Sequence, residues 1–366
     1  MSSMSNRALH PGIHPRDDWK NRAVFPCCSR GLRVGLRMIS DKDRLPWTRF
    51  ATTLRPPFPG SGRLLAAAMF KNEKFNIAIF AILIVLQALG VAAVWTRFQL
   101  YYLPIMLGIY FWIGLGTTLY LHRYLTHRGF EMPGWLKFIF ATGSAIGLSG
   151  DPVTWVGDHR FHHLKSDTEE DIHSPRHGFP YAHMMWLIRK PPSFRERSLR
   201  YAADVRKIWY CKLWENSALY VLPHLAVAGV LFATLGLAGM LWCLYVPILI
   251  IYNCTWAVNS ICHMKQFGYR SFETSDESKN NFWVGLGALG EGYHNNHHAK
   301  PRCAAHGLKW WEFDLTRYTI WTLEKLHLAW NVVWPDPTPA KKEQEELSAD
   351  EAGTMLITSA DPNSVL

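Results

Sequence analysis

The sequence GEGYHNNHH at residues 290–298 brings three histidines, His294, His297 and His298, within five positions of one another. Histidine is the commonest protein ligand of transition metals, which it binds through a neutral imidazole nitrogen. On a helix, positions i, i+3 and i+4 share one face, so the three rings can converge. This stretch therefore predicts part of a metal site.

The same spacing recurs upstream, where HRFHH carries His159, His162 and His163 and HRYLTH carries His122 and His127. In each HxxHH the outer pair lies about one helical turn apart, while the adjacent pair diverges by about 100°. Neighbouring rings can thus face different metals. Eight candidate ligands are more than the roughly four to six that one metal ion binds, so we expect a site with two metal ions. Zinc is redox-inert, and a redox role favours iron first and copper second.

The apolar residues, 49% of the chain, are concentrated in long runs. A helix needs about 20 apolar residues to cross a bilayer. A tight LGLAG turn separates the last two runs. We expect an all-α integral membrane fold with four transmembrane helices in two hairpins, and the spans are residues 76–95, 100–121, 217–237 and 238–257.

Basic residues set the expected orientation. The loop at 96–99 holds only Arg97, whereas residues 122–216 carry fourteen Lys and Arg. By the positive-inside rule, both termini and the central stretch face the cytosol, and so do all three histidine boxes. The protein is expected to be multi-pass, with a cytosolic histidine-rich helical domain. The membrane can be the bacterial cytoplasmic membrane, the endoplasmic reticulum or a plastid membrane.

The net charge of +10 comes from basic residues that flank the apolar runs, which favours a membrane surface over nucleic acid as partner. Residues 1–72 are basic and lack an apolar period, so we expect a poorly ordered extension. Residues 73–334 form the membrane domain. Residues 335–366 are rich in Pro, Glu and Lys and are expected to be disordered.

The ordered boxes resemble those of the membrane fatty acyl desaturases, the family that contains stearoyl-CoA desaturase, and more closely its bacterial and plant delta-9 branch. The motifs are HRYLTH at 122–127, DHRFHH at 158–163, WAVNSICH at 256–263 and GEGYHNNHH at 290–298. The resemblance implies two irons, with His263 of NSxxH as a ninth histidine. Asn259 would contact iron through water.

The resemblance also implies the reaction. Removing hydrogen from an unactivated methylene needs an oxidant that acid and base side chains cannot supply. We expect O2-dependent formation of a cis double bond, at delta-9 by family analogy, in an acyl chain carried on CoA or a lipid. Electrons would come from a separate cytochrome b5 or ferredoxin. A hydroxylase on the same scaffold is the closest alternative, and a non-catalytic metal-binding or transport protein is a third.

Other residues have expected roles beside these. Candidates for lining a bent acyl tunnel are Trp155, Thr255 and Trp256 at the bend and Gly114, Gly116 and Thr117 at its depth. Carboxylates that can orient the ligand imidazoles are Asp158, Asp171 and Glu291, with a capping or surface role as the alternative. Histidines expected not to bind metal are His173, His177, His183 and His306. His224, beside Pro223, is expected to be hydrogen-bonded within a span.

Overall fold

The computed structural model describes residues 74–190 and 193–335. The chain divides into two units, residues 1–54 and 55–366, and all described residues belong to the second. The expected poorly ordered extension lies outside the described residues, as does the expected disordered tail apart from residue 335.

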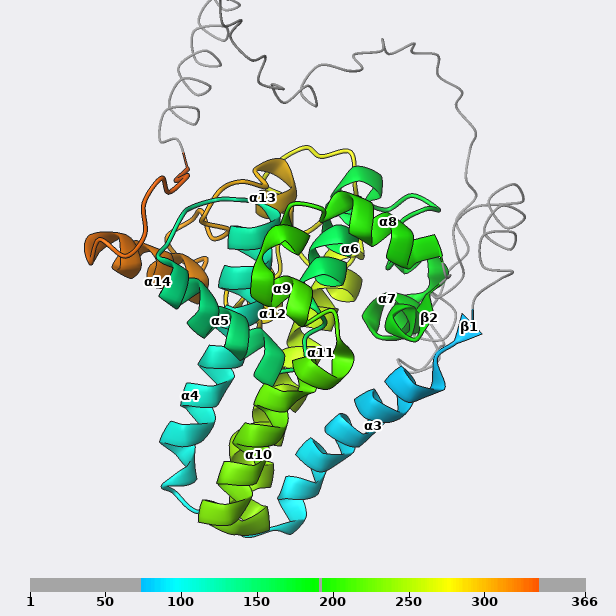
Figure 1. Cartoon of the computed structure of the whole chain (residues 1–366). Helices are drawn as coiled ribbons and strands as arrows, with labels where there is room; N and C mark the ends of the chain where they lie inside the picture. The colour runs from blue at the N-terminus through cyan, green and yellow to red at the C-terminus, as the bar shows by residue number, and fades with distance from the viewer. Residues whose placement is uncertain (1–73, 191–192, 336–366) are drawn as a thin grey trace, which may run out of the picture. The chain divides into compact units, whose positions relative to one another are not determined.

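Three helical runs of the described chain are long and apolar enough to cross a membrane. They are Ile77–Trp95, Tyr102–Thr126 and Ser217–His263. The first contains α3 (Ile77–Ala92), and the second joins α4 (Tyr102–Leu115) to the π-helix η2 (Gly116–Thr126). The third comprises α10 (Ser217–Met240), the π-helix η6 (Leu241–Tyr245), α11 (Val246–Ser260) and η7 (Ile261–His263). In Figure 1, α3, α4 and α10 fill the lower part of the structure.

The third run, 47 residues long, does not continue straight. Gly236, in the predicted LGLAG turn, has non-helical backbone angles (φ 69°, ψ −173°). His224 Nε2 lies 3.3 Å from the Tyr245 hydroxyl, although a straight helix would place residues 21 positions apart about 30 Å from each other. The chain therefore bends back on itself within this run. His224 is hydrogen-bonded as expected, since Nδ1 lies 2.8 Å from the carbonyl oxygen of Ile146.

Shorter helices cover one end of these runs, in the upper part of Figure 1. They are α5 (Gly134–Ile146), α6 (Pro152–Lys165), α7 (Phe179–His183), α8 (Ser193–Tyr201), α9 (Trp209–Leu213), α12 (Phe282–Gly287), α13 (His294–Ala299) and α14 (Leu315–Lys325). One antiparallel pair of two-residue strands, β1 (Lys74–Phe75) and β2 (Arg189–Lys190), joins the first span to this layer. The described chain is thus mostly helical, as predicted.

The helices of the covering layer pack on the second of these helical runs. Leu119 and Leu121 of η2 share one buried cluster with Phe140 of α5 and Ile320 of α14. Each such buried side chain stabilises the fold by about 1.5–3 kcal/mol. This cluster includes residues of the segment that carries the first histidine box, so the box rests on a buried, packed base.

Candidate metal centre

The first histidine box lies on the π-helix η2. Its hydrogen bonds span five residues, as from the His127 amide to the His122 carbonyl at 3.1 Å. An α-helix would turn residues five apart to faces about 140° apart, whereas i→i+5 bonding returns them to one face. The π-helix therefore directs both rings to the same place, which the sequence spacing did not predict.

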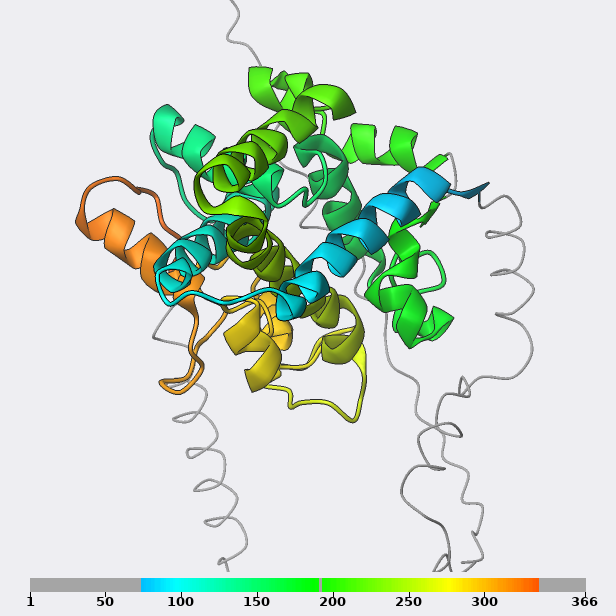
Figure 2. The ribbon, with the colours of Figure 1, turned by 90° about the horizontal axis from the view of Figure 1, so that it is seen from below.

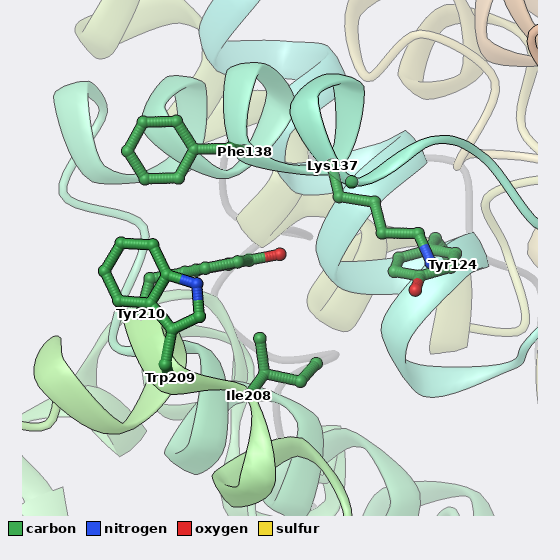
Figure 3. A pocket seen from close by; sticks show the side chains of 7 residues that line it. Tyr124, Lys137, Phe138, Ile208, Trp209 and Tyr210 are labelled. Atoms are coloured by element: carbon green, nitrogen blue, oxygen red, sulfur yellow. The ribbon is translucent and has the colours of Figure 1, made fainter.

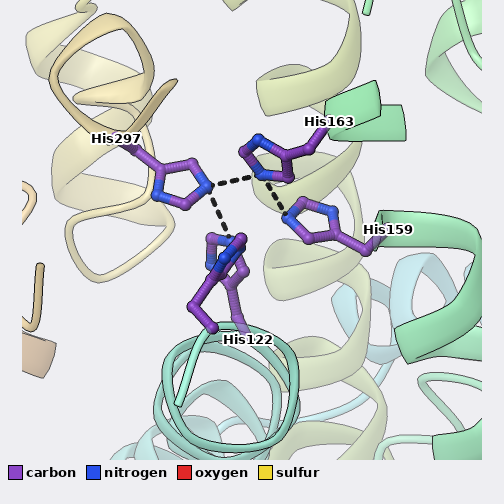
Figure 4. A group of neighbouring side chains, drawn as sticks. His122, His159, His163 and His297 are labelled. Carbon is purple, nitrogen blue, oxygen red and sulfur yellow. Dashed lines mark hydrogen bonds between the residues drawn. The ribbon is translucent and has the colours of Figure 1, made fainter. Parts of the chain in front are cut away.

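Five histidines form the first group. Their potential ligand nitrogens all lie within 4.8 Å of one another. His297 Nε2 lies 3.1 Å from His122 Nε2 and 2.9 Å from His163 Nε2. His163 Nε2 in turn lies 3.1 Å from His159 Nε2. Figure 4 shows these four rings pointing their Nε2 atoms at a common centre. The full group is His122, His127, His159, His163 and His297.

Four histidines form the second group, again within 4.8 Å: His162, His263, His294 and His298. His298 Nε2 lies 3.0 Å from His294 Nε2 and 3.4 Å from His162 Nε2. Helices α6 and α13 each supply both groups, because adjacent histidines diverge as expected. The structure thus divides the nine predicted histidines five to four. Asn259, four residues before His263, is half-buried on α11.

A carboxylate contacts the far nitrogen of four of these rings. The Nδ1 atoms of His122 and His298 lie 2.5 Å from Glu291 and 2.7 Å from Asp276. Burial alone would raise the pKa of Glu291, but contacts with His122, His306 and Arg123 hold it well below its usual value. Similarly, His298 outweighs burial and lowers the pKa of Asp276. The other two contacts are His162 to Asp171 at 3.0 Å and His263 to Asp167 at 2.9 Å.

These contacts determine which nitrogen carries the proton. A neutral imidazole that donates through Nδ1 has a bare lone pair on Nε2. Burial raises the pKa of Asp171 to about 7, so above that pH both His162 and His298 face ionised carboxylates. Their Nε2 lone pairs then oppose each other at 3.4 Å with no proton between them. A cation placed among the nitrogens would relieve that repulsion.

Two further observations fit a metal. Burial lowers the pKa of His159, His163, His294 and His297 well below the usual value, which keeps these rings neutral as ligation requires. The Nε2 atom of His127 is buried without a hydrogen-bond partner among the described residues, as is that of His263. A metal–nitrogen bond of about 2.1 Å gives ligand edges of about 3.0 Å in an octahedron and about 3.4 Å in a tetrahedron, which matches the spacings above.

A buried guanidinium supports the first group. Arg123, 1% exposed, donates to Glu291 at 3.0 Å and to both carboxylate oxygens of Asp314 at 3.0 Å. Gly290 has φ +115°, and a Cβ there would collide with Asp314 and Arg123. The glycine that opens GEGYHNNHH therefore lets this ion-pair network reach Glu291 and, through it, His122.

These observations place the chain in a family. The sequence model of the fatty acid desaturases matches residues 97–334, more than half of the chain. The chain belongs to the fatty acid desaturase family. It is 40% identical over 232 residues to icosanoyl-CoA 5-desaturase of Limnanthes douglasii, covering 63% of this chain and 64% of that protein. For sn-1 stearoyl-lipid 9-desaturase of Anabaena variabilis the values are 40% over 228 residues, 62% and 82%. For delta-9 acyl-lipid desaturase 1 of Arabidopsis thaliana they are 34% over 242 residues, 66% and 78%. This chain therefore spans slightly less than two thirds of the length of the Limnanthes desaturase.

The carboxylates of this desaturase-family chain differ partly from those expected. Asp171 and Glu291 contact histidines, but Asp158 accepts a 2.5 Å hydrogen bond from the Ser198 hydroxyl, which joins α6 to α8. Asp167 and Asp276, which also contact histidines, were not predicted from the sequence. Both lie in polar loops without helical periodicity: Asp167 shortly after the second box, and Asp276 between the NSxxH motif and GEGYHNNHH.

Of the histidines expected not to bind metal, two lie beside the groups. His306 Nδ1 is 3.2 Å from Glu291, and its ring centroid is 4.3 Å from that of His297. The ring of His173 lies 4.2 Å from that of His162. Burial lowers the pKa of His306 to about 4 and that of His173 to about 3, so both are neutral. His183 contacts Ser260 at 3.0 Å, and the ring of His177 lies 5.2 Å from that of Tyr181.

The candidates for the bend of an acyl tunnel occupy two places. The Trp155 ring stacks on His159, with centroids 5.1 Å apart, and meets His122 edge-on at 5.9 Å. Trp155 therefore borders the first histidine group. Trp256 contacts Tyr252 and the ring of His183. Thr255 donates its hydroxyl to the Ile251 carbonyl within its own helix, at 2.8 Å.

The three candidates for tunnel depth lie where the second helical run contacts other parts of the chain. A Cβ on Gly114 would collide with Leu289, and one on Gly116 would collide with the backbone of α5. The Thr117 hydroxyl lies 3.0 Å from that of Ser149. A cavity of about 360 Å³ lies elsewhere, between α5 and α9 (Figure 3), and none of the six candidates lines it. Its walls are Tyr124, Gly134, Lys137, Phe138, Ile208, Trp209 and Tyr210.

Proposed function

We propose that the protein is an O2-dependent fatty acyl desaturase that uses two histidine-bound irons. The division of the nine histidines into groups of five and four carries this proposal, because it matches the two ions expected from the eight box histidines. One iron would be held by the group containing His122. The other would be held by the group containing His263, with Asn259 contacting it through water.

Two irons, reduced by a separate cytochrome b5 or ferredoxin, would supply with O2 the oxidising power to remove one hydrogen from each of two neighbouring methylenes. The chain's own residues prepare the site for this. Burial keeps the imidazoles neutral and able to bind metal. Asp167, Asp171, Asp276 and Glu291 fix the ring orientations through Nδ1.

The substrate in this proposal is a saturated acyl chain carried on CoA or on a lipid, and the product has a cis double bond at delta-9. The names of the relatives include both carrier types, since one is an icosanoyl-CoA 5-desaturase and another a stearoyl-lipid 9-desaturase. Trp155 borders the first histidine group and is the foremost candidate for contacting the acyl chain there. Trp256, Thr255, Gly114, Gly116 and Thr117 remain candidates for more distant parts of the tunnel.

We also propose that the chain crosses the membrane four times in two hairpins, with both termini and the histidine groups on the cytosolic side. The bend at Gly236 supports this count, because it divides the 47-residue run into two segments that lie side by side at His224 and Tyr245. The fourteen Lys and Arg of residues 122–216 support the orientation.

A fatty acyl hydroxylase is the alternative function, because the same first hydrogen removal precedes both outcomes. Expression in a desaturase-deficient yeast, with double bonds located by mass spectrometry, separates the two. Cis monounsaturated chains from the wild type but not from His298→Ala establish a desaturase and report its bond position. Hydroxylated chains establish the alternative. Purified protein without bound iron would refute the di-iron proposal.

A further inference from the structure

Apolar side chains, most of them aromatic, are exposed on α14, on the loop before it and at its C-terminal cap. We call this surface the aromatic ledge, and its members are Trp310, Phe313, Tyr318, Trp321 and Leu326. Trp310 is 93% exposed and Trp321 is 51% exposed. Ile320 and Leu323, on the opposite side of α14, are buried. A helix that is apolar on both its inner and its outer face has a second apolar surface to cover.

Two cations lie along the ledge with their charges close to its rings, and a third lies beside the neighbouring ring of Trp311. Lys325 Nζ is 5.8 Å from the Trp321 ring, and the Arg317 guanidinium is 5.9 Å from the Tyr318 ring. Lys309 Nζ is 5.4 Å from the Trp311 ring. The carboxylate of Glu324 is held by the Trp334 indole at 3.0 Å. The ledge therefore combines apolar rings with positive charge. This combination suits a partner surface whose outer layer is anionic and whose deeper layer is apolar.

The contacts of α14 indicate its level along the second span. The Thr316 hydroxyl in its first turn lies 2.7 Å from the hydroxyl of Thr118, within the run Tyr102–Thr126. Thr118 is 16 residues beyond Tyr102, or about 24 Å along a helix, against a hydrocarbon core of about 30 Å. The first turn of α14 thus meets the span close to the edge of that core. In the view from below, which looks along the long helices (Figure 2), α14 (orange) lies beside these helices and is not covered by them.

We propose that the aromatic ledge lies in the headgroup layer of the bilayer, with its rings at the boundary of the acyl chains and its cations at lipid phosphates. Trp and Tyr favour this layer because their rings are apolar while their N–H or O–H group can remain in contact with water. Amphipathic helices with cations beside aromatic residues bind there in the plane of the membrane. The ledge would thus fix the tilt of the covering layer over the spans. This inference does not depend on the proposed reaction.

Spin labels at single cysteines test the proposal in the full-length protein. The variants are Trp310→Cys, Trp321→Cys and, as control, Glu273→Cys on an exposed loop. They are made in a chain with Cys27→Ser, Cys28→Ser and Cys254→Ala, and reconstituted in phosphatidylcholine–phosphatidylglycerol vesicles. Collisions with O2, which concentrates in lipid, are compared with collisions with a water-soluble nickel complex.

We expect a ratio of O2 to nickel collisions several-fold higher at positions 310 and 321 than at 273. Nickel collisions as frequent at 310 and 321 as at 273 would show a solvent-exposed ledge and overturn the proposal. Few collisions with either agent would show that protein covers the ledge and would also overturn the proposal. Size-exclusion chromatography of each variant before reconstitution excludes misfolded protein as the cause.

Discussion

Replacing Asp314 by Asn should destabilise the protein strongly, because its buried carboxylate accepts five hydrogen bonds beside the metal centre. Its two oxygens, 0% exposed, accept from both Arg123 Nη atoms and from the amides of His306, Gly307 and Arg317, at 2.8–3.1 Å. Asn keeps one acceptor and places an NH2 group against donors. Removing one partner of a buried ion pair costs about 3–5 kcal/mol. We expect the free energy of unfolding to fall by this amount.

Titration with SDS in mixed micelles measures the unfolding free energy of the wild type and of Asp314→Asn. Glu170→Gln is the matched control, because Glu170 forms a 3.1 Å ion pair with Lys165 at the surface. An exposed pair contributes about 0–1 kcal/mol, so the control should remain close to the wild type. If Asp314→Asn loses no more than the control, the buried network does not support the fold and the reasoning fails.

Three further predictions concern the metal centre and its backbone. Asp276→Asn should weaken iron binding by about 10- to 100-fold, because the carboxylate that orients the His298 imidazole is lost. Competition with a chelator measures the iron affinity. The control Glu277→Gln, which loses only a surface ion pair with Lys265, should bind iron as tightly as the wild type. In metal-free protein, burial lowers the pKa of His297, so this ring stays neutral when folded and takes a proton on unfolding below about pH 6.5. Unfolding then binds protons, and stability should fall with falling pH by up to about 1.4 kcal/mol per pH unit for each such ring; a flat profile of unfolding midpoints of chelated protein from neutral to mildly acidic pH would contradict this. Gly290→Ala should lower the free energy of unfolding by about 1–3 kcal/mol from its positive φ alone. The control Gly108→Ala, whose Cβ would meet nothing within 4 Å, should not destabilise α4. Equal effects of the two substitutions in SDS titration would refute the role given to the backbone at Gly290.

The parts of the structure that the sequence predicted follow from regular helical periodicity. The apolar stretches 76–95 and 100–121 were predicted to be helical, and they form α3 and most of the α4–η2 run. Uncharged stretches of that length have few other stable conformations in a membrane. The separation of His162 from His159 and His163 followed from the 100° step of the α-helix, since α6 is an ordinary α-helix. The same reasoning held for α13.

The parts that the sequence did not predict depend on irregular backbone. Nothing in HRYLTH distinguishes an α-helix from a π-helix, so the approach of His122 and His127 could not be derived from their spacing. Asp167 and Asp276 reach their histidines from loops, where no period relates one residue to the next. Asp158 lies beside its box in sequence, yet α8 packs there and takes its carboxylate.

The π-helix at the end of the second span has a consequence for how the protein matures. An uninterrupted π-helix of 11 residues is rare, since such turns mostly occur singly, and relaxation to α-helical pitch would swing His127 away from His122. Bound metal would oppose that relaxation, so the last turns of the span should be held more firmly once the ion is bound. We expect the backbone amides of residues 122–127 to exchange hydrogen faster in protein purified from iron-starved cells than in protein purified from iron-replete cells. A metal at the first histidine group would then stabilise the end of this membrane segment as well as the site itself.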